Sequence, residues 1–459
     1  MAKTDINLLS AFNLEPKEIV KYFESKNCKI SFDWHEVYEE AHAKAFTVAK
    51  MTEADLLKDT HKMLTTAIKE GWSEGKFKKN ATELFEKKGW VGKKEVINPK
   101  TGELQTVELG TPRRIKKIFH CNMTSAYSVG RYKEQMENVD VAPYLQYVAI
   151  LDSRTRPEHA AMNGKVFRYD DPIWNTMYPP NGWNCRCFVT QLTKGDVRRK
   201  NIEVESSEGR IKEVSEVVGD TEKQNTVYTF SKGGNVYHLK PDAGWGTNLG
   251  MFDYIPDMEK YNYEIASRTT DVFVYSKVFD RFYNRCSNLA EKFEEKAISK
   301  LTENGQKITT GAIQNCAVND FLRKKYSNLM KNTDFSIAIL SEEQKKLLKT
   351  SKQTIKLSAE TLIKEQIKHK DLNIDDFRKI SSFVKNSDVM IYENQTENLL
   401  CFKLSNKFFI IALKSTKEKT SNYVKTFHFS NLKDLQKELK KANNTVIFDK
   451  LNIKRNDLT

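Results

Sequence analysis

The chain has 459 residues, which exceeds the size of one ordinary domain and predicts two or three. Its formal net charge of +14 favours an acidic partner such as nucleic acid but carries no information about the fold. The first residues lack the continuous apolar core of a secretion signal, and no stretch approaches the roughly 20 apolar residues of a membrane span. We therefore expect a soluble protein made in the cytoplasm, with no membrane partner.

The first third of the chain is predicted to be mainly helical. Apolar residues at helical spacing follow Thr52, a predicted N-cap, and the pattern stops at Gly71. The segment 93–110 reads as a β-hairpin, with Asn98, Pro99, Thr101 and Gly102 as its turn residues. A long amphipathic helix should begin near Thr111 and Pro112, and its exposed face carries several cations.

The segment "YLQYVAILDSRTRPEHAAMNGKVF" places a set of polar residues directly after an apolar run. Tyr147 to Leu151 is a candidate buried strand. Four residues with charged or reactive side chains follow it: Asp152, Arg154, Arg156 and His159. They are consistent with a site, but Asp152 can equally accept hydrogen bonds from the backbone or from an arginine and fix the turn. We favour this clamp.

The segment "YPPNGWNCRC" places Cys185 and Cys187 one residue apart. The chain's seven cysteines are too sparse for a secreted disulfide framework, and this spacing strains a disulfide. A catalytic thiol would need a base such as His159 and a cation such as Arg186. His159, Cys185 and Cys187, with Asp152, would also make a tetrahedral zinc set, although Cys-x-Cys is weaker than the usual Cys-x-x-Cys motif. A buried structural turn is the interpretation we prefer, and a structural zinc ion is the alternative.

Three blocks in order resemble the phage head morphogenesis family typified by phage Mu protein F. They are "AFTVAK" with the helix behind it, "TSAYSVGRY", and "LDSRTRPEHAAMNGKVF" leading to "PPNGWNCRC". "LKPDAGWGTNLG" is similar to the aromatic and glycine tail of that family. The resemblance implies a minor capsid protein that accompanies the portal during prohead assembly, with Pro179, Pro180 and Trp183 in the signature turn. Many relatives carry a histidine just before the final Cys-x-Cys, where this chain has Gly182 and Trp183.

The rest of the chain changes character twice. Residues 256–330 read as a polar helical connector with mixed charges, and we interpret them as a solvated spacer. Further on, two helices are predicted, one capped by Ser358 and one with Asp375 and Asp376 in its first turn. The runs "DVMIYE", "NLLCFKLS", "KFFIIALKS" and "NYVKTFHFS" then predict four strands of an antiparallel sheet.

Strict alternation in the last of these strands gives it two different faces. One face of this strand should carry Val424, Thr426, His428 and Ser430. The opposite face should carry Lys425, Phe427 and Phe429. A metal-free ribonuclease needs a base, an acid and a cation that stabilises the phosphorane, and histidines supply the first two near neutral pH. On composition alone, the interpretation we prefer for these residues is an ordinary surface of a lysine-rich domain.

A second resemblance favours the nuclease. The order "KHKDL…DDF…LLCFKLSNKFFIIALKST…YVKTFHFS" is similar to phage barnase–EndoU–colicin–RelE-like nuclease domains, which often follow the Mu protein F-like module. It covers roughly Phe335 to Asp449, and its motifs are diffuse. The site positions that it implies are His369, Lys414, Thr426, His428 and Ser430, with their roles left open. The excess of lysine fits an RNA partner.

These observations predict a multidomain α+β protein in four parts. The parts are a mainly helical head-morphogenesis module (1–195), an extension (196–255), the helical connector (256–330) and a ribonuclease-like α+β domain (331–459). We expect a phage or prophage minor capsid protein, located in the virion and in the host cytoplasm during assembly. Its expected partners are portal, capsid and scaffold proteins, with RNA or packaged DNA. The alternative is a purely structural protein whose C-terminal domain binds portal, scaffold or DNA without catalysis.

Overall fold

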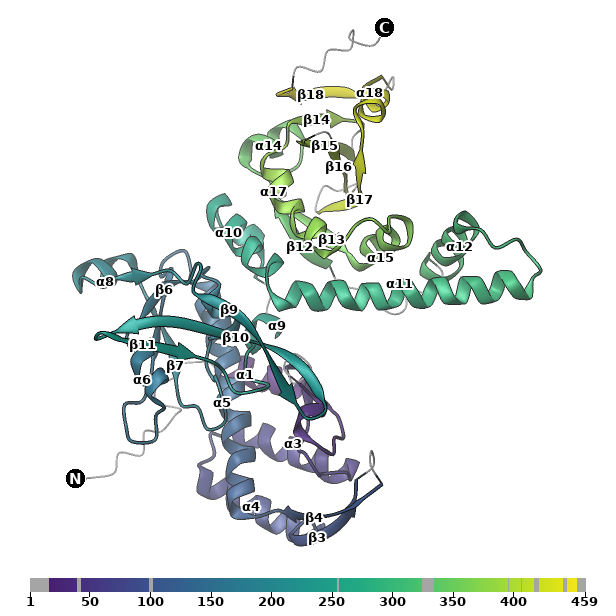
Figure 1. Ribbon diagram of the computed structural model, residues 1–459. Helices are drawn as coiled ribbons and strands as arrows, with labels where there is room; N and C mark the ends of the chain where they lie inside the picture. Colours follow the sequence, from purple (N-terminus) through teal and green to yellow (C-terminus); the bar gives the residue numbers. More distant parts are fainter. Residues whose placement is uncertain are drawn as a thin grey trace. The chain divides into compact units, whose positions relative to one another are not determined.

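The structure of the protein is a computed structural model whose contacts divide the chain into two compact units (Figure 1). Unit 1 is Met1–Pro256 and unit 2 is Asp257–Thr459. The structure describes residues 16–38, 43–98, 102–253, 256–323, 334–394, 396–405, 407–416, 421–440 and 444–451. The multidomain α+β class predicted from the sequence is confirmed, since each unit combines helices with small sheets. Within the described ranges, no helix is both long and apolar enough to cross a bilayer.

The helical part of unit 1 packs around α3 (Ala54–Lys69), α4 (Glu74–Lys87) and α5 (Pro112–Glu137). Leu57, Phe85 and Ile115 are fully buried where these helices meet. As expected, α5 begins at Pro112, and the Thr111 side chain accepts a hydrogen bond from the amide of Arg114. α3 starts later than predicted: Glu53 rather than Thr52 is its N-cap, with no side-chain cap hydrogen bond.

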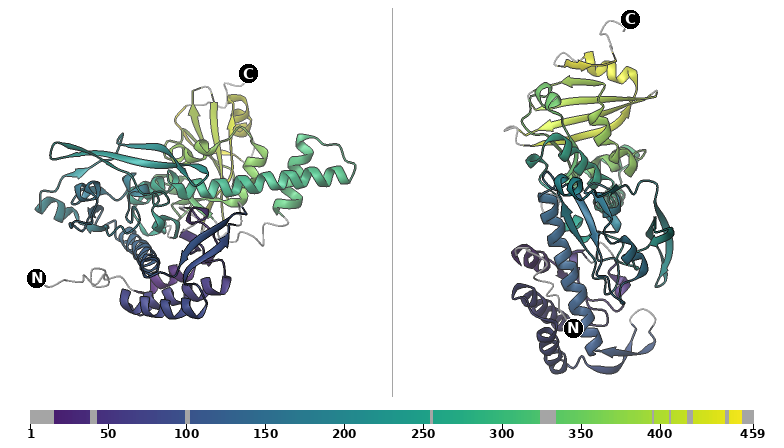
Figure 2. Two further views of the ribbon diagram at one scale, coloured as in Figure 1. Left: turned by 60° about the horizontal axis from the view of Figure 1, so that its bottom comes forward. Right: turned by 90° about the vertical axis from the view of Figure 1, so that its left-hand side faces the viewer.

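The remaining elements of unit 1 form the small sheets and short helices around this core. The predicted hairpin is confirmed as β3 and β4, although Pro99 and Thr101 of its turn lie outside the described residues. A four-stranded sheet has the order β7-β5-β6-β8, and β11-β10-β9 form a long antiparallel ribbon (Figure 2). The helices are α1 (Pro16–Glu24), α6 (Pro157–Met162), α7 (Ile173–Thr176), α8 (Lys194–Arg199) and α9 (Leu249–Asp253), with the 3₁₀ turn η1 (Trp34–Glu36). The strands are β1 (Asn27–Cys28), β2 (Ala45–Phe46), β3 (Gly92–Ile97), β4 (Leu104–Leu109), β5 (Tyr144–Val148), β6 (Val166–Arg168), β7 (Phe188–Leu192), β8 (Val204–Glu205), β9 (Ile211–Val218), β10 (Thr221–Lys232) and β11 (Asn235–Leu239).

Unit 2 is built on a seven-stranded sheet with the order β12-β13-β17-β16-β15-β14-β18. The four strands predicted from the sequence are confirmed as the antiparallel neighbours β14 to β17. β13 pairs with β17 in parallel, and β18 extends the other edge beside β14. The strands are β12 (Asp334–Ile339), β13 (Thr354–Ser358), β14 (Val389–Tyr392), β15 (Glu397–Leu404), β16 (Lys407–Ser415), β17 (Asn422–Ser430) and β18 (Thr445–Asp449).

The helices of unit 2 include the segment that the sequence suggested was a solvated spacer. α11 (Lys277–Glu303) buries one stripe of side chains, among them Phe279 and Leu301, and packs against α15 (Ala359–Lys368) (Figure 1). The spacer interpretation is therefore wrong for this face of the helix, because its apolar positions recur at helical spacing beneath the charges. The other helices are η2 (Met258–Lys260), α10 (Tyr263–Val274), α12 (Thr310–Cys316), η3 (Ala317–Leu322), α14 (Glu342–Leu347), α16 (Ile374–Arg378), α17 (Ile380–Lys385) and α18 (Leu432–Lys440).

The caps predicted in unit 2 are confirmed, but strict alternation along β17 is not. Ser358 caps α15, and the side chains of Asn373 and Asp376 form a capping box on α16. The pairing between β16 and β17 shifts register between Ala412 and Leu413. Val424 and Phe427, three positions apart, are consequently both buried. The predicted shared face of Val424, Thr426 and His428 is therefore interrupted by this irregularity.

Candidate functional site

The signature turn of unit 1, residues 178–187, is anchored at several points along its length. The Tyr178 hydroxyl donates to Gln135 on α5 at 2.7 Å, and the Ser128 hydroxyl donates to the carbonyl of Pro179. The peptide bond between Pro179 and Pro180 is cis, and both rings are buried. The turn is thus fixed against α5 before it reaches its two cysteines.

Asp152 forms the clamp that the sequence suggested for it, with Arg154 before the turn and Arg186 within it as partners. Its carboxylate accepts from the amide of Arg154 at 3.0 Å and from the Arg186 guanidinium at 2.8 Å. Arg186 and Arg154 together hold the pKa of Asp152 well below its usual value, against a smaller opposing effect of desolvation. Arg186 thereby ties the Cys-x-Cys segment to the loop that follows β5.

A second carboxylate, Asp242, fixes the other side of the turn. It accepts a bidentate pair from Arg156, at 2.7 Å for each contact, and a hydrogen bond from the amide of Trp183 at 2.8 Å. Burial raises the pKa of Asp242, but the hydrogen bonds from Arg156 and Trp183 outweigh it, so the pKa lies below its usual value. Gly182 touches this carboxylate: a Cβ there would lie 2.3 Å from Asp242 Oδ2.

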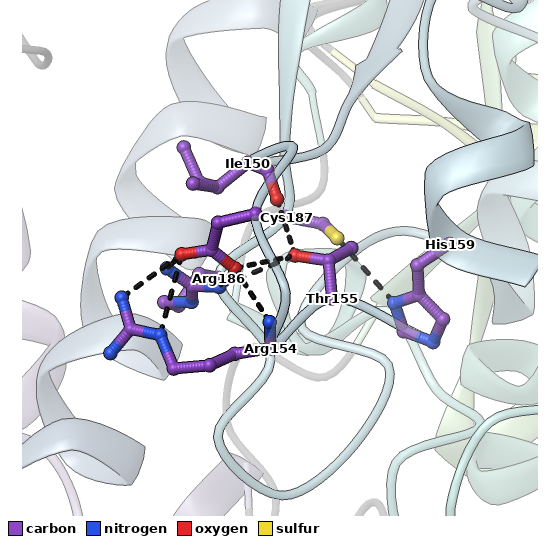
Figure 3. A network of polar contacts seen from close by, with 7 residues as sticks. Ile150, Arg154, Thr155, His159, Arg186 and Cys187 are labelled. Atoms are coloured by element: carbon purple, nitrogen blue, oxygen red, sulfur yellow. Dashed lines mark hydrogen bonds and ion pairs between the residues drawn. The ribbon is translucent and has the colours of Figure 1, made fainter. Parts of the chain in front are cut away.

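His159, Cys185 and Cys187 come together at the centre of this arrangement. His159 Nδ1 lies 3.4 Å from Cys187 Sγ and 3.7 Å from Cys185 Sγ, and Figure 3 shows the imidazole facing the sulfur of Cys187. All three potential ligand atoms lie within 4.8 Å of one another. Asp152 is engaged by the two arginines and is not part of this group, so the tetrahedral set that included it is not formed.

The two thiols share one hydrogen-bonded environment, and their pKa values move apart. The Cys187 thiol and His159 stabilise a thiolate on Cys185, so its pKa falls well below the usual value despite the cost of desolvation. The pKa of Cys187 rises because of its neighbour Cys185 and its own burial. All seven cysteines, each of them in the described ranges, are free thiols. The thiols of this cluster can therefore lose their protons when a cation binds, and they do not form a disulfide.

The turn also borders a cavity of unit 1 with a volume of about 540 Å³. Trp34, Trp183 and Trp245 line it, with edge-to-face ring contacts at 5.8 and 5.2 Å between centroids. Lys117 on α5 lies with its ammonium 5.2 Å from the Trp183 ring centroid. Cys121 also lines the cavity, and burial raises the pKa of its thiol to about 11.

Unit 2 has an open cavity of about 320 Å³ between α15 and β17. The rings of His369 and His428 stack across it with centroids 5.8 Å apart and planes 12° apart. Glu365, buried beneath them, has its Oε2 atom 3.5 Å from His369 Nε2 and 3.4 Å from the Thr426 hydroxyl. Three lysines complete the lining: Lys364, Lys368 and Lys425.

The structure brings together only part of the predicted nuclease set. His369, Thr426 and His428 line this cavity. Lys414 is an exposed residue of β16 opposite Tyr423, and Ser430 lies opposite Phe408 at the end of β17. Neither residue lines the cavity.

Sequence reasoning missed Glu365 and the lysines around it. Glu365 is 1% exposed, and its Oε1 atom pairs with Lys364 at 2.8 Å. The available signal was the spacing of Glu365 and His369, since residues four apart face each other on a helix.

Comparison with known proteins finds a family match in unit 1. Residues 58–190 match the family described as Phage Mu protein F like protein. "Putative capsid assembly protein F" of Escherichia phage Mu is 38% identical over 255 residues, which cover 54% of this chain and 57% of that protein. The "Mu-like prophage FluMu F protein" of Haemophilus influenzae is 41% identical over 232 residues, 50% of this chain and 55% of that protein. No solved structure matches the chain.

These matches support the Mu protein F-like resemblance for the N-terminal part of the chain. The matched region, residues 58–190, contains the clamp of Asp152 and the whole signature turn, whereas Asp242 lies outside it. The chain spans a little over half the length of these curated relatives. The resemblance of unit 2 to phage nuclease domains stays a prediction.

Proposed function

We propose that the protein acts in the assembly of a phage head and that unit 2 is a metal-independent ribonuclease. The observation that supports the assembly role is the extended identity with the F protein of phage Mu, whose name refers to capsid assembly. The proposed partners are the portal, capsid and scaffold proteins of the same phage genome. The proposed location is the assembling head and the finished virion.

Co-expression with these partner proteins tests the assembly role. The full chain should co-purify with portal or head particles, and deletion of its gene from the phage should reduce the yield of filled heads. Asp152→Ala, which releases Arg154 and Arg186, should weaken this association, whereas the exposed control His238→Ala should not. Normal head yield without the gene would contradict the role.

The ribonuclease proposal depends on the two imidazoles that face one another across the cavity of unit 2. RNA cleavage by transesterification needs one group to take the 2′-hydroxyl proton and another to protonate the leaving 5′-oxygen. The 2′-oxygen attacks phosphorus, the bond from phosphorus to the 5′-oxygen breaks, and a 2′,3′-cyclic phosphate forms. His369 and His428 are suited to both proton transfers near neutral pH.

The residues around the imidazoles fit the remaining requirements. Lys364, Lys368 and Lys425 supply positive charge for the non-bridging oxygens of the phosphorane. Glu365 is placed to orient His369, and the Thr426 hydroxyl donates to the same carboxylate. Carboxylates are seldom fully buried. The burial of Glu365 beneath an open cavity lined by lysines therefore favours a functional role over an ordinary surface.

The test is incubation of the full chain with RNA in the presence of a metal chelator. Cleavage should yield cyclic phosphate ends, and His369→Ala and His428→Ala should each slow it by about 10²–10⁴-fold. Lys346→Ala, an exposed lysine of α14, is the control that should retain the wild-type rate.

A binding role for unit 2 predicts a different result. The full chain would then bind portal, scaffold or DNA, and RNA would remain intact. Absence of cleavage by the wild-type protein, or equal cleavage by both histidine variants, would overturn the ribonuclease proposal and favour the binding role. Either result leaves the assembly proposal for unit 1 to its own test.

A further inference from the structure

We propose that His159, Cys185 and Cys187 bind one zinc ion in unit 1. The three side chains come from two segments that the fold brings together: His159 from α6, and the cysteines from the end of the signature turn before β7. Their convergence is not a consequence of neighbouring positions in the chain, because His159 is separated from Cys185 by 26 residues.

The separations between ligand atoms fit a tetrahedral ion. With Zn–S bonds of about 2.3 Å and Zn–N bonds of about 2.0–2.1 Å, tetrahedral angles separate nitrogen from sulfur by about 3.6 Å. The two distances from His159 Nδ1 to the sulfurs are 3.4 and 3.7 Å. An ion can therefore be accommodated with only small movements of the three side chains.

The surroundings also favour zinc over unmetallated thiols. His159 and Cys187 are 3% and 6% exposed, so a thiolate here has little access to water. A zinc ion with two thiolates and one neutral imidazole has no net charge, which suits a buried position. Without the ion, the site either keeps both thiols protonated or buries an isolated negative charge.

Tyr147 lies beside the three proposed ligands. Its hydroxyl lies 3.4 Å from His159 Nδ1 and donates to Asn181 Oδ1 at 3.0 Å. Both Tyr147 and Asn181 are fully buried, and the amide nitrogen of Asn181 has no hydrogen-bond partner within the described part of the chain. The structure thus supplies three ligands. The phenol oxygen of Tyr147, or a water molecule held by Tyr147 and Asn181, would be the fourth.

Metal analysis of the purified full-length protein tests this inference. We expect one zinc per chain in protein prepared without chelators, and loss of that zinc in Cys185→Ser and in Cys187→Ser. Cys121→Ser is the matched control, because Cys121 is also a partly buried thiol of unit 1 but lies outside the cluster. Retention of zinc by both cluster variants, or its absence from wild-type protein supplied with equimolar zinc, would overturn the site.

Cobalt substitution of the wild-type chain provides a readout that does not depend on the folding of any variant. Co²⁺ bound by two thiolates and one imidazole should give intense visible bands of tetrahedral geometry and a thiolate charge-transfer band in the near ultraviolet. Equimolar zinc should abolish both. Cobalt bands without the charge-transfer feature, or no bands, would contradict the proposed ligands.

Discussion

Lys26 is a buried cation close to the end of α1 in unit 1, and it makes the stability of this unit dependent on pH. It is 4% exposed, and desolvation lowers its pKa to about 7. The rings of Tyr22 and Phe23 lie 5.6 and 5.9 Å from its ammonium, which offsets only part of the desolvation cost. Below about pH 7, the folded protein must keep this charge buried.

Replacing Lys26 with methionine should therefore stabilise unit 1 at low pH. Between the folded and unfolded pKa values the unfolded chain binds more protons, so the wild-type free energy of unfolding should rise from about pH 7 towards pH 10. Lys26→Met should raise this free energy by about 1–3 kcal/mol at pH 6 and remove that part of the rise. Denaturant unfolding at several pH values measures both effects, and an equal gain at pH 6 and pH 10 would contradict the explanation.

Gly182 is required by the close approach of Asp242 to the signature turn. A Cβ at this position would lie 2.3 Å from Asp242 Oδ2, and that carboxylate is already held by Arg156 and by the amide of Trp183. Gly182→Ala should therefore destabilise unit 1 by about 1–3 kcal/mol in chemical denaturation. Gly195→Ala is the control, since its Cβ would meet its nearest neighbour at 3.5 Å and should be tolerated.

At the scale of elements, the strands and caps of unit 2 follow from local patterns, whereas its candidate site does not. Apolar runs separated by turns indicated β14 to β17, because such a run is a property of each strand alone. The irregularity in β17 depends on its pairing with β16, so strict alternation placed Val424 on the wrong face. Lys414 entered the predicted set through resemblance alone, while the lysines that line the cavity come from α15 and β17.

Glu365 lies four residues before His369 on α15, and in the proposed ribonuclease it positions this imidazole. Glu365→Gln keeps the size of the side chain but replaces the carboxylate 3.5 Å from the imidazole by a neutral amide, so His369 loses the charged partner that orients it. We expect kcat/KM for RNA cleavage to fall about 10-fold.

The matched control for this change is Glu360→Gln, an exposed glutamate on the same helix, which should leave the rate unchanged. A wild-type rate in Glu365→Gln, or an equal loss of rate in both variants, would contradict this role of Glu365.

For the whole molecule, local sequence patterns predicted the signature turn of unit 1 better than they predicted where the chain divides into units. The clamp of Asp152 and the turn were predictable because their residues lie within one short stretch, from Asp152 to Cys187. Asp242, which completes the turn, is distant in sequence and gave no local signal. The connector looked solvated because charged and polar residues together outnumber apolar residues on α11, although the apolar residues form one continuous stripe.

Two units, each with its own buried core, should unfold in two transitions, and only the transition of unit 1 should depend on zinc. Zinc at 100–1,000 times its Kd contributes about 2.7–4.1 kcal/mol, and each kcal/mol corresponds to about 2–4 °C for units of this size. A strong chelator should thus lower the unfolding temperature of unit 1 by roughly 5–16 °C and leave that of unit 2 unchanged. Calorimetry of the full chain measures this, with Phe377→Leu, a core change in unit 2, identifying the second transition. Equal lowering of both transitions, or of neither, would contradict a zinc site confined to the signature turn.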